Sequence, residues 1–82
     1  MEIAIYTLTA QEVKEQEAII EKNNQRIQQE LALGDLMNPE NVALYAQNIK
    51  TAYNNINKGI RFDAPFMVET MRSNPQATIV NI

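Results

Sequence analysis

The chain reverses direction at residues 34–40, whose sequence is GDLMNPE. Gly34 can adopt the left-handed conformation that ends a helix. Asn38 can cap the next helix, and the first position of that helix suits Pro39. Because so short a connection leaves two helices side by side, the stretch predicts an antiparallel helical hairpin.

The helix before this turn begins with a capping box. In residues 8–13, LTAQEV, the Thr9 side chain can accept a hydrogen bond from the backbone three residues on, while Glu12 reaches back to Thr9. No helix breaker follows before Gly34. The first helix is therefore predicted over residues 10–33.

Two further helices follow the turn. The second is predicted over residues 39–58, with Gly59 as its stop. Asp63 is expected to cap a short third helix over residues 65–72, and the breakers at residues 73–75 end it.

The two ends of the chain are rich in β-formers, over residues 3–7 and 77–82. They could pair as a small ribbon, or either could be an arm that docks on a neighbouring subunit. The sequence as a whole predicts one small domain over residues 1–82, of the all-α class, with extended N- and C-terminal segments.

The two long helices differ in apolar content. The second carries a regular stripe, made of Val42, Tyr45, Ile49, Ala52, Ile56 and Ile60. The first offers Val13, Ile20, Ile27 and Leu31, with Glu17 and Asn24 between them. Two interpretations stay open: part of the first helix faces another subunit, or it is a solvated helix that touches the core along one edge.

Composition excludes several function classes. The 82 residues contain no cysteine and no histidine, which removes disulfides, the usual zinc sites, thiol nucleophiles and histidine bases. Both glycines are explained as helix stops, so no phosphate loop is present. We expect no enzyme, no metal and no cofactor. A domain of this size buries only about 60–65% of its unfolded surface, so a homo-oligomer is expected.

Charge and hydropathy restrict the partners. Residues 1–40 hold three basic and eight acidic side chains, and residues 41–82 hold four basic and two acidic ones. A net charge of −3 without a basic run argues against duplex nucleic acid. No apolar run is long enough for a membrane span, so we expect a cytoplasmic protein with no membrane partner. A small anionic ligand, or a host protein, remains possible as a partner.

The second half of the hairpin holds the candidate ligand residues. On a helix, Lys50, Lys58 and Arg61 fall along one face together with asparagine amides. Such a face can hold phosphates by charge-assisted hydrogen bonds, or it can simply be solvated. A tyrosine can stack on a nucleobase, although Tyr53 also suits a core or interface.

Two segments of the chain resemble a known family. The first is Tyr6-Thr7-Leu8-Thr9-x-x-Glu12, and the second is Ile49-Lys50-Thr51-Ala52-Tyr53-x-x-Ile56-x-Lys58-Gly59-Ile60. Over about residues 6–61 they are similar to the small phage anti-CBASS sponges. The resemblance implies a helical homo-oligomer that sequesters cyclic oligonucleotide immune signals and so acts as an anti-defence inhibitor in the host cytoplasm.

The resemblance also implies roles for individual residues. Tyr6 is similar in place to a base-stacking tyrosine, and Lys58 to a basic residue that serves the larger cyclic ligands. Where the family carries a lysine on the first helix, this chain has Ile20. The residues expected to bind ligand, some of them across a subunit boundary, are Tyr6, Lys22, Arg26, Lys50, Tyr53, Lys58 and Arg61.

A second resemblance concerns the turn. Residues 35–40, DLMNPE, between two helices are similar to the hairpin turn of type III secretion needle subunits. That resemblance implies a needle-like structural protein that polymerises as a helical hairpin. In that family a continuous helix ends the chain, whereas Pro65 and Pro75 interrupt this one.

Overall fold

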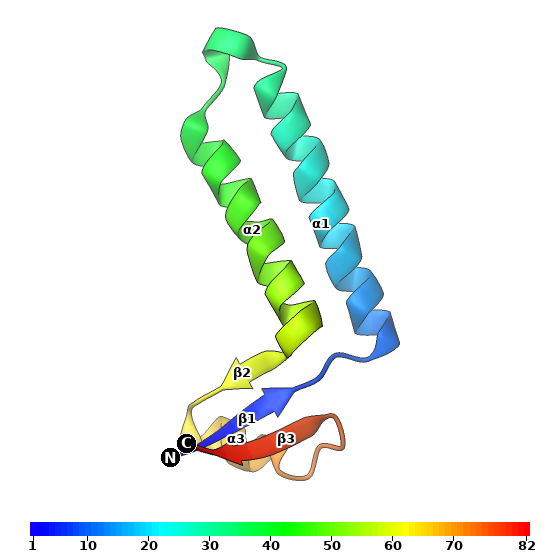
Figure 1. Ribbon diagram of the computed structural model, residues 1–82, viewed down its shortest axis with the longest axis vertical. Helices are drawn as coiled ribbons and strands as arrows, with labels where there is room; N and C mark the ends of the chain where they lie inside the picture. The colour runs from blue at the N-terminus through cyan, green and yellow to red at the C-terminus, as the bar shows by residue number, and fades with distance from the viewer.

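Seven elements follow one another along the computed structural model, which describes residues 1–82. They are β1 (Glu2–Tyr6), α1 (Ala10–Leu31), the 3-10 turn η1 (Gly34–Leu36), α2 (Pro39–Lys58), β2 (Ile60–Phe62), α3 (Pro65–Met71) and β3 (Ala77–Asn81). The two long helices stand side by side on a small sheet, and η1 lies at the far tip (Figure 1).

The helical hairpin forms where the capping residues place it. The Glu12 amide donates to Thr9 Oγ1 at 3.2 Å, and the Thr9 amide donates to Glu12 Oε1 at 3.0 Å. At the turn, the Glu40 amide donates to Asn38 Oδ1 at 2.9 Å. Gly34 has a left-handed φ of 58°, and α1 ends at Leu31, two residues before the predicted end.

The predicted all-α class is wrong, because the chain also builds a three-stranded antiparallel sheet in the order β2-β1-β3. The two ends do pair, with Ala4 opposite Ile79. The third strand comes from residues 60–62, although the apolar spacing predicts Ile60 as part of the helical stripe. Ile60 lies opposite Tyr6 instead. Its β-branched side chain suits a strand as well as a helix face, so the apolar spacing alone did not distinguish the two.

Gly59 is needed at the junction of α2 and β2 for a reason beyond ending the helix. Its φ is 82°, and a Cβ atom at this position would lie 2.5 Å from the Tyr6 carbonyl oxygen. No L side chain fits such an approach. The glycine therefore lets the chain leave α2 and enter the sheet directly beside β1.

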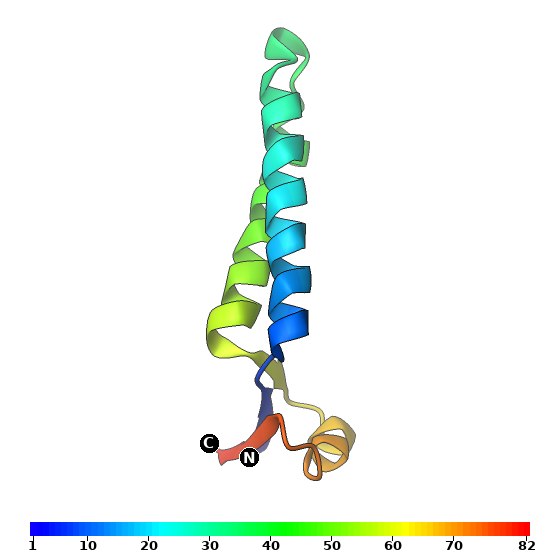
Figure 2. The same ribbon diagram turned by 90° about the vertical axis from the view of Figure 1, so that its right-hand side faces the viewer.

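The short helix α3 packs against β1 and β3, and Figure 2 shows it on one side of the sheet. Val68 is buried there, and so are Ile3 and Ala4 of β1, the central strand. The predicted cap is wrong, because Ala64 occupies the N-cap position and Asp63 pairs with Arg61 at 2.6 Å instead.

The seam between α1 and α2 is partly polar. Its buried residues are Ile20 and Asn23 on α1 and Ala52 on α2. The Asn23 amide donates to the Ile19 carbonyl at 2.7 Å, and the Asn48 amide donates to Asn23 Oδ1 at 3.1 Å. The two helices are therefore joined by an asparagine pair as well as by apolar packing.

The molecule is elongated. Its principal extents are 51 × 25 × 16 Å and its radius of gyration is 16.5 Å, against about 12 Å for a compact chain of this length. Only 6 of the 82 residues are buried. The hairpin projects from the sheet, and no other element of the chain covers it (Figures 1 and 2).

Candidate ligand-binding site

A hollow of about 380 Å³ lies along the second half of α2. Its lining residues are Gln47, Lys50, Thr51, Tyr53, Asn54, Asn57 and Lys58. Most of them recur at steps of three and four residues, which places them on one side of the helix. Ala52, on the side that meets α1, is buried. The hollow, named here the α2 hollow, therefore opens away from α1.

The two lysines of the α2 hollow are free to meet an anion. The three ion pairs of the structure involve only Arg61 and Arg72 as cations. No carboxylate lines the hollow. Its other polar groups are amides and the hydroxyls of Thr51 and Tyr53, which can complete hydrogen bonds to phosphate or base atoms.

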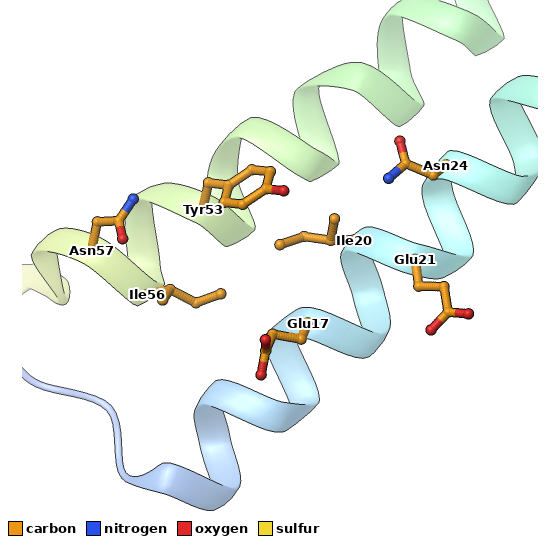
Figure 3. Close-up of a pocket in the computed structure, with 7 residues that line it drawn as sticks. All are labelled: Glu17, Ile20, Glu21, Asn24, Tyr53, Ile56 and Asn57. Atoms are coloured by element: carbon orange, nitrogen blue, oxygen red, sulfur yellow. The ribbon is translucent and has the colours of Figure 1, made fainter.

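A second hollow, of about 430 Å³, lies between α1 and α2 (Figure 3). Ile20 and Ile56 extend towards each other from the two helices, and the Tyr53 ring reaches towards α1. Glu17 and Glu21 line its α1 side. We name this hollow the interhelix hollow. No lysine or arginine lines it, so its carboxylates oppose the binding of a phosphate.

The structure brings together three of the seven predicted ligand residues, namely Lys50, Tyr53 and Lys58. The other four line none of the hollows. Lys22 is an exposed residue of α1, and the Arg26 guanidinium lies 5.8 Å from the centroid of the Tyr45 ring. The remaining two predicted ligand residues, Tyr6 and Arg61, lie on β1 and β2 respectively.

Tyr6 is tied to the capping box of α1. Its hydroxyl donates to Glu12 Oε1 at 2.7 Å, and its ring is half-buried. This hydrogen bond raises the pKa of the Tyr6 phenol. The pKa of Glu12 is lowered, first by the Thr9 backbone amide and then by the Tyr6 hydroxyl. The Tyr6 hydroxyl is thus engaged with the capping box of α1, a contact that the predicted base-stacking role does not include.

Gln47 and Thr51 line the α2 hollow but were not among the predicted residues. They bond to each other at 3.3 Å, one helical turn apart. Their spacing from Lys50 and Asn54 was the signal in the sequence, because residues three or four apart share a helix face. Neutral side chains such as these carry neither a charge nor an aromatic ring that would single them out in the sequence.

The arrangement suits binding. No group of three or more carboxylates is placed to hold a metal ion. Ammonium and amide groups in the α2 hollow can hold phosphate oxygens through charge-assisted hydrogen bonds. Neither α1 nor α2 combines the length and the apolar character required of a membrane-spanning helix.

Comparisons of this chain with protein-family models, with curated proteins and with solved structures found no match.

Proposed function

We propose that this protein is a non-enzymatic phage sponge that binds cyclic oligonucleotide signals in the host cytoplasm and assembles as a homo-oligomer. The α2 hollow carries this proposal, because it combines two unpaired lysines with amides and a half-exposed tyrosine on one helix face. Withholding the signal from its effector requires binding alone, without chemistry on the ligand.

Each part of the α2 hollow matches one part of a cyclic nucleotide. Lys50 and Lys58 are eight residues apart, or roughly 12 Å along a helix, so each can meet a different phosphate. The Asn54 and Asn57 amides lie in the same hollow, where they can bond to base edges or ribose hydroxyls. Tyr53, which is 52% exposed, offers a ring on which a base can stack.

Cyclic di- and trinucleotides provide the test, in a thermal-shift panel followed by calorimetric titration. A ligand at about a hundred times its dissociation constant adds about 2.7 kcal/mol to the stability of the folded state. For a chain of this size, the melting temperature should rise by several degrees.

Two matched variants locate the binding. Lys58→Gln removes one ammonium group from the α2 hollow and should weaken binding about tenfold, because a hydrogen bond to a charged group contributes about 1.5–3 kcal/mol. Lys22→Gln removes a charge from outside the hollow and should leave affinity within about twofold. A panel without any shift, or equal losses in the two variants, would rule out this site.

A second candidate function is a structural or interaction protein, and the leucines of the hairpin tip favour it. Leu33, Leu36 and Leu44 are 49%, 82% and 56% exposed. A small inhibitor of a host protein could bind its target through this tip. A needle-like polymer fits less well, because α2 stops at Lys58 and the chain turns into β2 instead of continuing as a helix. Filaments in light scattering, with no response to nucleotides, would favour the polymer.

A further inference from the structure

One face of the hairpin combines apolar side chains with Glu17, Glu21, Asn24 and Asn57, and the fold leaves it incompletely covered. It is formed by Val13, Ile20 and Leu31 of α1 and Val42, Ile49, Tyr53 and Ile56 of α2. The α2 residues are seven, four and three positions apart, so they lie on one side of the helix. Only Ile20 is buried, while Tyr53 and Leu31 are 52% and 50% exposed. We name this surface the partner face; the interhelix hollow lies within it (Figure 3).

The opposite face of the hairpin is different in character. By helical spacing it carries the half-buried Asn48 and Asn55 on α2 and Glu15 and Lys22 on α1, together with Leu44 and Ile19, which are 56% and 41% exposed. Exposed apolar side chains thus occur on both faces. The partner face is distinguished by the interhelix hollow, where Ile20, Tyr53 and Ile56 leave an apolar surface that a second copy can fill.

The chain exposes more surface than a compact monomer of the same mass, and the excess is about the area that one copy contributes to an interface. The chain exposes 5854 Å², whereas a compact monomer of 9.3 kDa exposes about 5,000 Å². The excess, about 850 Å², is close to the roughly 800 Å² that each partner contributes to an interface of standard size. The surplus surface of one copy is thus sufficient for one stable contact.

The charges beside the partner face are complementary to one another. Tyr53 and Asn57 line both hollows, so Glu17 and Glu21 lie on one side of the tyrosine and Lys50 on the other. Asn48 bonds to Asn23 across the antiparallel pair. Glu21 and Lys50 each lie two residues closer to the sheet than this asparagine pair. They are therefore at the same height along the hairpin. A second copy that presents the same face can match Glu21 with Lys50, while Glu17, level with Asn54 by the same count, meets no cation.

We propose that two copies pack partner face to partner face, about a two-fold axis parallel to the helices, and form a four-helix bundle. In this arrangement α1 lies over α2 of the second copy, and Glu21 meets Lys50 of the second copy twice, as an isologous contact requires. The bundle covers Tyr53 and Ile56. The bundle takes Tyr53, Asn57 and Lys50 from the α2 hollow, so it shares these side chains with the proposed ligand site, while Asn54 and Lys58 stay outside it.

Charge reversal tests this interface by sedimentation velocity over a range of concentrations. Glu21→Lys should place like charges together and weaken the dimer about tenfold, and Lys50→Glu should do the same. The combined variant E21K/K50E restores the pairs with reversed sign and should recover dimerisation to within about threefold. Glu15→Lys, on the opposite face, is the matched control and should have no effect.

A second variant tests the apolar centre of the interface. Tyr53→Glu puts a carboxylate where the two faces meet and should leave only monomer, while circular dichroism confirms that the helices remain, since Tyr53 is half-exposed in the single chain. A wild-type monomer at every concentration would overturn the proposal. A dimer that resists both single reversals would also overturn it, as would a double variant no better than either single one.

Discussion

At the scale of single residues, the two glycines of the chain carry different constraints. Both have positive φ, 58° at Gly34 and 82° at Gly59. A Cβ atom at Gly34 would meet nothing within 4 Å, whereas at Gly59 it would meet the Tyr6 carbonyl oxygen. Gly34→Ala should therefore cost only the left-handed backbone conformation, about 1–2 kcal/mol.

Gly59→Ala adds a steric clash with β1 to that backbone cost. We expect a loss of at least about 3 kcal/mol in the free energy of unfolding, measured by urea denaturation beside Gly34→Ala. Equal losses in the two variants would show that the approach of Gly59 to Tyr6 contributes nothing.

The capping box makes the stability of α1 depend on pH. The Glu12 carboxylate accepts bonds from Thr9 and Tyr6, and these lower its pKa below the ordinary value of 4.5. A carboxylate with a lowered folded pKa contributes stability above the unfolded pKa, and that contribution is lost as pH falls through the folded pKa. Stability should therefore decline below about pH 4.5.

Glu12→Gln isolates this contribution. The variant should be less stable than wild type at about pH 7, and its free energy of unfolding should change less between about pH 7 and pH 3. Glu2, whose pKa Arg72 also lowers, leaves a residual slope in both proteins. Glu15→Gln is the control, because this side chain has no hydrogen bond or ion pair, and it should keep the full wild-type dependence of the free energy of unfolding on pH. The same full dependence in Glu12→Gln would contradict this explanation.

At the scale of the elements, the asparagine pair of the hairpin seam gives a further prediction. Asn23 is 4% exposed and accepts the amide of Asn48. Asn23→Ala leaves that amide without its acceptor and should cost about 1–3 kcal/mol. The double variant N23L/N48L removes donor and acceptor together and should match or exceed wild-type stability, by thermal unfolding. Equal destabilisation in both variants would show that the seam needs its polar pair.

Helix starts could be predicted from the sequence because each is encoded in a few adjacent residues. Thr9 with Glu12, and Asn38 with Pro39, are local signals, and the structure confirms both caps. The sheet could not be predicted in the same way. β2 has only three residues, and its pairing with β1 joins segments more than fifty residues apart.

The candidate site was predictable to the extent that it lies on one helix. Lys50, Tyr53 and Lys58 come together because helical spacing alone determines their common face. Tyr6 and Arg61 were grouped with them, although both lie on strands and bond to Glu12 and Asp63. Their positions follow from the sheet, which the sequence interpretation did not include.

At the scale of the whole molecule, the elongated shape points to assembly. Two helices joined along one seam bury few residues, and none of the other elements within residues 1–82 covers them. A second copy could supply the missing cover on the partner face. Because this cover includes Tyr53 and engages Lys50, assembly and ligand binding would share part of the α2 hollow, and Asn54 and Lys58 would stay accessible.

Native mass spectrometry of the wild-type chain, mixed with cyclic di- and trinucleotides, tests this account most directly. It reports the number of copies and the bound nucleotides in one spectrum. We predict a species of two 9.3 kDa chains, or a multiple of that pair, which retains nucleotide. A single 9.3 kDa chain with nothing bound would contradict the account.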